Sequence, residues 1–349
     1  MLNKISQKEF IEFNRVFSLL LISRLPIITA LELITRQTKN ENFKAIIKKI
    51  TIDVKSGSSL SKSFSKYPEI FSEIYLANLR VAEETGNIAE VLTEYTDYQE
   101  KFYNLKKKIT QAARYPLFVI VVSFGVIFFM MFFLIPTFEA LFNSVKAGLP
   151  PLTAFLLGLS QAVVDNGIYI FLGFAVLMLM VNSALKNENF KENVIDRLVL
   201  RLPYVSNLFI KNLLARFSLS MGILLKSKVS LLEALKISRN ISTNSVFKKE
   251  ISEITKKLVK GESFSNNIQN SKFFDVTFSK LLAAGEESAE LDKVFYLISD
   301  YYTSEFDHKI DNMTTMIEPF LILFVGSIVA IILIAMYLPM FEIINYVGV

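Results

Sequence analysis

Two stretches of this sequence lack any charged residue, and each lies between two prolines. The stretches are residues 117–135, between Pro116 and Pro136, and residues 320–338, between Pro319 and Pro339. Each holds 19 residues. As a helix, such a stretch spans about 28 Å, close to the roughly 30 Å hydrocarbon core of a bilayer. Because neither stretch has the polar stripe of a helix on a soluble protein's surface, the sequence predicts two transmembrane helices.

A third uncharged run, residues 166–185, is also long enough to cross a bilayer. Hydrophobic residues make up 52% of the chain and charged residues 20%. The charged residues gather in two blocks, residues 1–115 and 186–318, each long enough for a domain outside the membrane. We therefore expect three membrane helices and two charged domains.

Basic residues flank the predicted membrane helices unevenly. Five precede the first helix, from Lys101 to Arg114, and four follow the second, from Lys186 to Arg201. Only Lys146 lies in the loop between these helices, and no basic residue follows the third helix. Cytoplasmic flanks of membrane helices are enriched in Lys and Arg. We therefore expect the N-terminus and both charged blocks in the cytoplasm, and the loop and the C-terminal tail on the other side.

The proline-bracketed stretches belong to a longer internal repeat. Equivalent positions lie 203 or 204 residues apart, and they include Pro116 and Pro319, Pro136 and Pro339, Gly57 and Gly261, and the segments 13–31 and 217–235. A sustained offset of this kind indicates one structural unit used twice. Each unit is expected to be a cytoplasmic domain followed by a membrane helix, and the middle membrane helix returns the chain to the cytoplasm.

Both charged blocks have the apolar spacing of helices. Apolar residues recur at intervals of three and four in the segment 13–21 and in its counterpart 217–225. Gly57 and Gly261 close Lys-rich apolar stretches, which is typical of a helix C-cap. The expected fold class is an all-α membrane protein with about six helices in each repeated cytoplasmic domain. The last helix of each domain is expected to run toward the membrane, from near Ile88 in the first domain and from near Leu291 in the second.

These observations predict a division of the chain into seven segments. They are a cytoplasmic domain (1–115), a transmembrane helix (116–138), a loop on the other side of the membrane (139–165), a second transmembrane helix (166–185), a second cytoplasmic domain (186–318), a third transmembrane helix (319–339) and a tail on the other side (340–349). In the loop, the apolar residues 149–164 predict a helix on the outer membrane surface, with a re-entrant segment as the alternative.

The four prolines are expected at the membrane boundaries. At Pro116 and Pro319, where the chain enters the bilayer, proline either starts a new helix or kinks a continuous one. Pro136 and Pro339 are expected where the chain leaves the bilayer on the outer side.

The residue content of the chain excludes several kinds of functional site. The chain has no Cys and a single His308, which excludes disulfides, thiolate catalysis and a Cys-ligated zinc site. No GxxxxGK[ST] motif is present, so any ATP must be hydrolysed by a partner. The predicted membrane helices carry no ionisable Asp, Glu, Lys, Arg or His, which argues against ion-coupled transport. We expect no enzyme and no nucleic-acid partner, and keep a small-solute transporter or channel and a membrane sensor as alternatives.

Acidic residues crowd the junction before the last helix of each repeat. They are Glu83, Glu84, Glu286, Glu287 and Glu290. On a helix, Glu286 and Glu290 would share one face and could bind Ca²⁺ or Mg²⁺. The alternative is that the acids interact with a helix dipole or face a partner. Gly86 and Ala289 in the same junctions are expected to allow close helix packing, and no other cofactor is expected.

Several segments resemble the type II secretion system F / type IV pilus PilC family. They are the paired E-x-[ST]-[GA]-x-[IL] motifs at 83–88 and 286–291, the Tyr-Pro pair before the first membrane helix, and the segment 202–225. The chain departs from the family at Arg24 and Lys228, where its members usually have Gly.

The resemblance implies a non-enzymatic platform protein in the bacterial inner membrane. It is expected to be multi-pass, with a cytoplasmic N-terminus and a periplasmic C-terminus. It implies that the protein couples a cytoplasmic hexameric assembly ATPase to pilin or pseudopilin polymerisation. Other inner-membrane assembly proteins and further copies of the same chain are the remaining implied partners.

Overall fold

The computed structural model describes residues 5–137, 150–186, 196–269 and 271–347, which contain helices and no strand. The first repeat has six helices: α1 (Gln7–Ile22), α2 (Ile27–Gln37), α3 (Glu41–Lys55), α4 (Leu60–Phe64), α5 (Glu73–Thr85) and α6 (Ile88–Phe129). The second repeat has their counterparts: α11 (Pro203–Lys226), α12 (Leu231–Ser238), α13 (Ser245–Val259), α14 (Phe264–Ile268), α15 (Val276–Ser288) and α16 (Leu291–Val347). The remaining elements are η1 (Met130–Leu134), α8 (Pro151–Lys186), α10 (Asp196–Arg201) and η3 (Arg239–Ile241). The predicted all-α fold with six helices per repeat is confirmed.

The helices begin and end at residues that the sequence itself supplies. Asn40 and Asn244 occupy the N-cap positions of α3 and α13, where their side chains accept hydrogen bonds from backbone amides of the first turn. Gly57 and Gly261 follow the ends of the same two helices with a left-handed φ of 88° each. The predicted glycine C-caps are confirmed, because a residue with a Cβ is strained at this φ.

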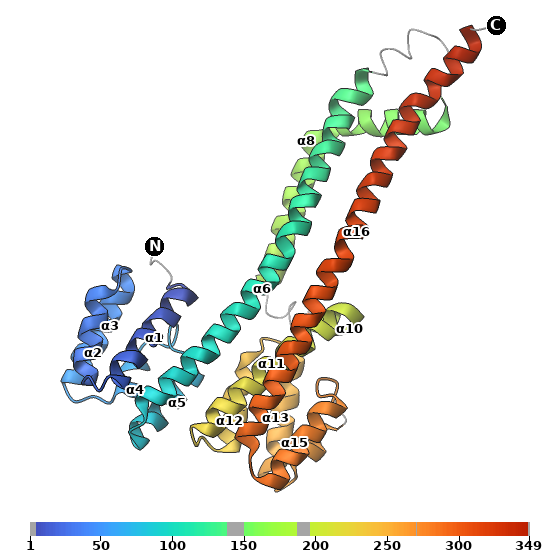
Figure 1. The fold of residues 1–349 in the computed structure, drawn as a ribbon. Coiled ribbons are helices and arrows are strands. Elements are labelled where there is room, and N and C mark those ends of the chain that lie inside the picture. The colour runs from blue at the N-terminus through green and yellow to red at the C-terminus, as the bar shows by residue number, and fades with distance from the viewer. Residues whose placement is uncertain (1–4, 138–149, 187–195, 270, 348–349) are drawn as a thin grey trace. The chain divides into compact units, whose positions relative to one another are not determined.

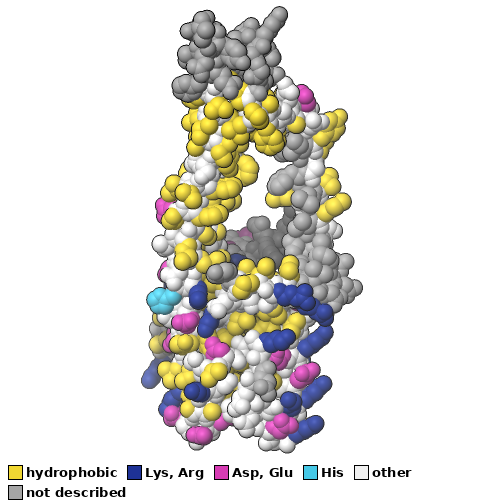
Figure 2. All heavy atoms as spheres, turned by 90° about the vertical axis from the view of Figure 1, so that its right-hand side faces the viewer, with side chains coloured by type: hydrophobic (Ala, Val, Ile, Leu, Met, Phe, Trp, Pro, Cys, Tyr) yellow, Lys and Arg dark blue, Asp and Glu magenta, His cyan; other side chains and the backbone are white. Residues whose placement is uncertain are grey.

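The chain divides into two compact units. Unit 1 is Met1–Lys108 with Glu192–His308, and unit 2 is Ile109–Lys191 with Lys309–Val349. Helices α6 and α16 belong to both units (Figure 1). In Figure 2 the charged side chains cluster on unit 1, while unit 2 exposes mainly hydrophobic ones.

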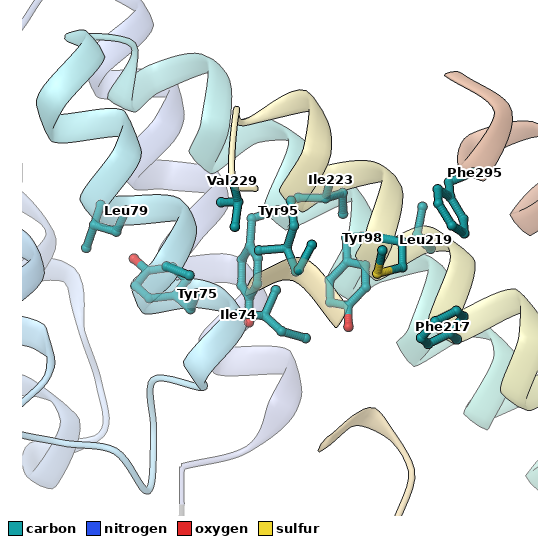
Figure 3. Close-up of a cluster of buried hydrophobic side chains, with 14 of the residues drawn as sticks. Ile74, Tyr75, Leu79, Tyr95, Tyr98, Phe217, Leu219, Ile223, Val229 and Phe295 are labelled. Carbon is teal, nitrogen blue, oxygen red and sulfur yellow. The ribbon is translucent and has the colours of Figure 1, made fainter. Parts of the chain in front are cut away.

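Unit 1 has one hydrophobic core that both repeats share. Figure 3 shows α5, α6 and α11 side by side, with Ile74 and Tyr98 of the first repeat near Leu219 and Ile223 of the second. Because the core is continuous, the two repeats are halves of one body rather than independently packed domains.

All four of the prolines expected at the membrane boundaries lie inside long helical stretches, Pro136 within Ile88–Thr137. Helix α6 runs through Pro116, and α16 runs through both Pro319 and Pro339. The alternative in which Pro116 and Pro319 start new helices is therefore wrong, since losing one backbone N–H does not end a helix held by many other bonds. Residues 340–347, expected as a tail, continue α16.

The expected surface helix and the second membrane helix form a single helix, α8. In Figure 1 its first part lies across α6 and α16, and its later part turns along α6. The uncharged residues 166–185 lie in this later part.

Length and composition would also allow α11 to cross a membrane, together with α6 and α16. However, 61% of the most apolar stretch of Val205–Lys226 is buried, against 22% in Ile88–Thr137 and 17% in Leu291–Pro339. A membrane helix of this fold exposes its apolar side chains to lipid, whereas those of α11 fill the core of unit 1. Of these three candidates, α6 and α16 therefore suit a membrane, and the crossing by residues 166–185 of α8 stays a prediction.

Candidate functional site

The motif glutamate of the first repeat, Glu83, holds the start of the short helix α4. Its carboxylate accepts hydrogen bonds from the backbone amide of Leu60, and from the amide (2.9 Å) and the hydroxyl of Ser61. A helix of five residues is unstable by itself. A carboxylate at its N-terminus accepts hydrogen bonds from the free N–H groups and interacts favourably with the positive end of the helix dipole. Glu83 therefore fastens α4 to α5.

Glu286 does the same in the second repeat. Its carboxylate accepts hydrogen bonds from the amides of Phe264 (2.7 Å) and Ser265 (2.9 Å) and from the Ser263 hydroxyl (2.9 Å), at the start of α14. Burial acts to raise the pKa of Glu286, but these hydrogen bonds outweigh it and leave the pKa below its ordinary value. The carboxylate is thus held in its charged form.

The proposed pairing of Glu286 with Glu290 on one helical face is wrong. Helix α15 ends at Ser288, so Glu290 lies beyond it and forms an ion pair with Lys293 instead. Both oxygens of Glu286 already accept backbone amides. Among the described residues, no group of three or more His, Cys, Asp or Glu is placed to hold a metal.

The neighbouring acids Glu84 and Glu287 are exposed to solvent. They therefore differ from Glu83 and Glu286, although all four lie in the same motif.

Gly86 and Ala289 cap α5 and α15 in the left-handed conformation, with φ of 75° and 55°. The expectation that they allow close packing is wrong for Gly86, since a Cβ there would meet nothing within 4 Å. Close packing occurs at Gly285 instead, where a Cβ would lie 3.0 Å from the side chain of Val294.

Polar contacts join the two repeats around their shared core. Arg216 of α11 lies over the Phe102 ring of α6, with 4.6 Å from its guanidinium carbon to the ring centroid. Burial lowers the pKa of Arg216, and the nearby Tyr98 acts against this shift. Lys226 forms an ion pair with Glu94 on the same two helices. These contacts fix which face of α6 meets α11.

Ion pairs also join α6 and α16 directly. In unit 1, Lys101 lies 3.0 Å from Asp300, and seven residues further along both helices Lys108 lies 3.2 Å from Asp307. The equal spacing shows that the two helices run in the same direction there.

In unit 2, two hydroxyl groups of α8 bond to backbone carbonyls beside the outer prolines. Helix α16 contains Pro339, which has no N–H to give to the carbonyl of Ala335, four residues earlier. The buried hydroxyl of Thr153 donates a hydrogen bond to that carbonyl. It therefore satisfies a carbonyl that the proline leaves without a helical partner.

Pro136 has the same effect in the first repeat. The chain is π-helical at Met130–Leu134, where the amide of Ile135 bonds to the carbonyl of Met130, five residues earlier. The next donor in this pattern would be residue 136, a proline, so Met131 lacks a helical partner. The buried Ser160 hydroxyl donates to the Met131 carbonyl at 2.6 Å.

The hydroxyls of Thr153 and Ser160 thus fasten the first part of α8 to both membrane helices that end a repeat. Apolar side chains complete this contact in a second core of Met130, Met131, Ile135, Leu156, Leu157, Ile332, Ala335 and Met336. Neither Thr153 nor Ser160 was predicted from the sequence as a functional residue. The available signal was two hydroxyl residues seven positions apart, two helical turns, in an apolar segment.

The fold and these contacts define a class of protein: an all-α membrane protein with two copies of a helical repeat, each continuous with a membrane helix. The sequence model of the family described as "Type II secretion system (T2SS), protein F" matches this chain twice, at residues 13–136 and 217–339. The matched segments begin 204 residues apart and end 203 residues apart (217 − 13 and 339 − 136), which is the offset of the internal repeat.

Relatives of similar length carry two kinds of name. The chain is 33% identical to the type IV pilus assembly protein PilC of Thermus thermophilus, over 98% of this chain and 84% of the relative. It is 28% identical to PilC of Pseudomonas aeruginosa, over 99% and 92%. It is 27% identical to the type II secretion system protein F of the same organism, over 99% and 85%. The chain belongs to the type II secretion system protein F family.

Proposed function

We propose that this chain is the inner-membrane platform protein of a type IV pilus or type II secretion machine. In this role it couples a cytoplasmic assembly ATPase to the polymerisation of pilins or pseudopilins. The observation that carries the proposal is the doubled family match on a chain in which each repeat passes through one helix into a membrane segment.

Two long helices connect the core of unit 1 to apolar segments. The helix α6 has 42 residues and α16 has 57, and each runs without a break from the core of unit 1 into an apolar segment. A displacement imposed on unit 1 would be transmitted along such helices instead of being lost in a flexible linker. Withdrawing a hydrophobic pilin helix from lipid is costly, at about 25 cal/mol per Å² of apolar surface, so an external source of energy is required.

The energy source is expected to be a separate ATPase, because the sequence has no P-loop. We propose that the chain is not an enzyme and that unit 1 is the part that contacts the ATPase. The purified chain should bind no ATP but should co-purify with the assembly ATPase.

A gene deletion tests the function as a whole. We expect pilins and ATPase to be produced in the deletion strain, with the pilins retained in the inner membrane. Surface filaments or secretion in that strain, with no paralogue present, would disprove the proposal. A substrate-dependent current across liposomes containing the chain would instead favour the transporter alternative.

The orientation is proposed from the distribution of basic residues. A single Cys at Lys146 or Gly348 should react with a membrane-impermeant reagent in intact spheroplasts, and a Cys at Lys55 or Lys260 only after lysis. The natural absence of Cys makes the background low. Labelling at Lys260 without lysis would contradict a cytoplasmic unit 1.

A further inference from the structure

An open groove lies within unit 1 at the contact between the two repeats. The first repeat contributes residues of α1, α5 and α6 to its lining, and the second contributes residues of α11, α12 and η3. Its volume is about 490 Å³, within the range of roughly 300–1,000 Å³ that is typical of small-molecule sites. The groove therefore exists only because the two repeats meet.

Arg216 of α11 brings a positive charge to this groove. Its Nε atom is buried and has no hydrogen-bond partner among the described residues. The described groups that act on its charge are the Phe102 ring and Tyr98, and neither is a carboxylate. Removing a charge from water without a counter-charge is costly, and an aromatic ring offsets only part of that cost. Arg216 therefore lacks the anion that a buried guanidinium normally binds.

The repeat offset shows that Arg216 is not part of the pattern that folds each repeat. At 204 residues, the buried Phe217 corresponds to the buried Phe13, but Arg216 corresponds to Glu12. At 203 residues, Phe102 corresponds to Glu305. If Arg216 only packed the repeats together, an uncharged side chain of similar length would serve equally well. The charge itself thus calls for another explanation.

The rest of the lining suits a molecule that is partly apolar. Ile74 and Ile237 supply apolar surface, and in Figure 3 the hydroxyl of Tyr98 points toward the side on which Ile74 lies. One acid, Glu73, also lines the groove. It is exposed to solvent and accepts a hydrogen bond from Asn240 at 2.8 Å, so water screens its repulsion of a bound anion.

We propose that this groove binds a small organic acid, with its oxyanion on Arg216 and its apolar part against Ile74 and Ile237. A guanidinium binds a carboxylate or a phosphate through two parallel hydrogen bonds, and the bound acid supplies the missing counter-charge. Because both repeats line the groove, the ligand stabilises their contact. The proposal does not depend on the proposed function.

Ligand-observed NMR on the full-length chain in detergent tests the site, with benzoate and phenyl phosphate as probes. We expect saturable binding of at least one, because each has an oxyanion and an apolar ring, and the tighter probe identifies the acid group. Benzamide has the ring without the charge and should not bind. Inorganic phosphate has the charge without the ring and should displace the probe only at higher concentration. No saturable binding of either charged probe, or equal binding of benzamide, would overturn the proposal.

Substitutions at Arg216 locate the bound probe. Arg216→Gln removes the charge and should weaken binding at least about tenfold. Arg216→Lys keeps the charge but cannot form two parallel bonds, so its affinity should be intermediate. Arg80→Gln is the matched control, since Arg80 is exposed on α5 and does not line the groove; it should bind the probe as the wild type does. Equal affinity of Arg216→Gln and wild type would overturn the proposal.

A further variant leaves Arg216 in place. Gln99 lines the groove, and Gln99→Glu adds a carboxylate of the same size that should compete with the probe and lower its affinity. The probe should also raise the unfolding midpoint of the wild-type chain, because it binds the folded state, but not that of Arg216→Gln. Unchanged affinity in Gln99→Glu, or an equal rise in the midpoint of Arg216→Gln, would contradict binding at this groove.

Discussion

The first and second repeats use the same helices and nearly the same caps, but they differ on their outer faces. Equivalent positions in the turns keep their role: Glu83 and Glu286 both fasten a short helix, and Gly57 and Gly261 have the same left-handed φ. In contrast, the buried Tyr98 corresponds to the 40% exposed Tyr301. The comparison separates residues that fold a repeat from residues that decide what the repeat contacts.

The two repeats also differ in the residue that caps the N-terminus of α5 and of its counterpart α15. At the N-cap of α5, the Ser72 hydroxyl bonds to the hydroxyl of Tyr95 at 3.1 Å. At the equivalent N-cap of α15, the Asp275 carboxylate accepts from the hydroxyl of Tyr302, whose ring lies 4.7 Å from the Lys211 ammonium. The first arrangement has no charge, and the second is charged and therefore sensitive to pH.

The largest expected effect concerns the motif glutamates. Glu83→Ala and Glu286→Ala should each destabilise the chain by about 2–3 kcal/mol, because each leaves several donors at a helix start without an acceptor. Thermal unfolding of the full chain in detergent, followed by circular dichroism, measures this. The adjacent Glu84→Ala and Glu287→Ala are matched controls expected within about 0.5 kcal/mol of wild type. If only one of the two variants lost stability, Glu83 and Glu286 would not have equivalent roles in the two repeats.

A smaller effect is expected at the outer prolines. Thr153→Val should cost about 1–2 kcal/mol, because the Ala335 carbonyl then has no donor. In a Pro339→Ala background the new backbone N–H can serve that carbonyl, so the same substitution should cost little.

For the first repeat, the corresponding variants are Ser160→Ala by itself and Ser160→Ala combined with Pro136→Ala. Unfolding free energies from all variants give two double-mutant cycles, one per repeat. Thr153→Val and Pro339→Ala effects that simply add would show that proline and hydroxyl are not coupled.

The charged cap of the second repeat predicts a pH dependence. Burial acts to raise the pKa of Asp275, but bonds from Tyr302, Phe278 and Lys211 outweigh it and leave the pKa below its ordinary 3.8. The charged form therefore stabilises the fold above pH 3.8, and this stabilisation is lost as pH falls through the lowered pKa.

Asp275→Asn keeps an N-cap acceptor but removes the charge, and should cost about 1 kcal/mol at neutral pH. The difference from wild type should vanish in strong acid. Ser72→Ala should give a difference that does not change over the same pH range. Unfolding midpoints measured from neutral pH down to acid distinguish the two outcomes, and a constant cost for Asp275→Asn would mean that its charge is irrelevant.

The smallest expected effects concern left-handed residues with a side chain. Arg24 and Lys228 occupy equivalent turns with φ of 61° and 65°, a region that only Gly adopts without strain. Arg24→Gly and Lys228→Gly should each stabilise the chain by about 0.5–1 kcal/mol. Gly86→Ala, at φ of 75°, should have the opposite sign. Unfolding midpoints in detergent measure all three, and destabilisation by either Gly variant would mean that the side chain makes a contact that outweighs the strain.

Much of the fold follows from the sequence because its signals are local. The glycines after α3 and α13, the starts of α6 and α16 at Ile88 and Leu291, and the two proline-bracketed membrane helices depend on spacing within one element. The repeat offset then transfers each expectation from one half of the chain to the other.

Less of the candidate site could be predicted from the sequence, because its contacts join residues that are far apart in the chain. Glu83 reaches a helix start 23 residues earlier, and a spacing rule for one helix instead suggested that Glu286 and Glu290 share a face. Thr153 and Ser160 find their carbonyls 182 and 29 residues away. A proline shows that a carbonyl is left unpaired, but it does not show which distant donor will satisfy it.

The sequence by itself determined that this chain has two similar helical halves and where each half enters an apolar segment, since periodicity, capping and bilayer length are properties of neighbouring residues. Only the tertiary structure decided that the halves share one core and that α5 and α6 of the first half pack on α11 of the second. Equivalent sequences offer equivalent faces, and which of them is buried depends on side chains that meet across the fold, such as Arg216 over Phe102.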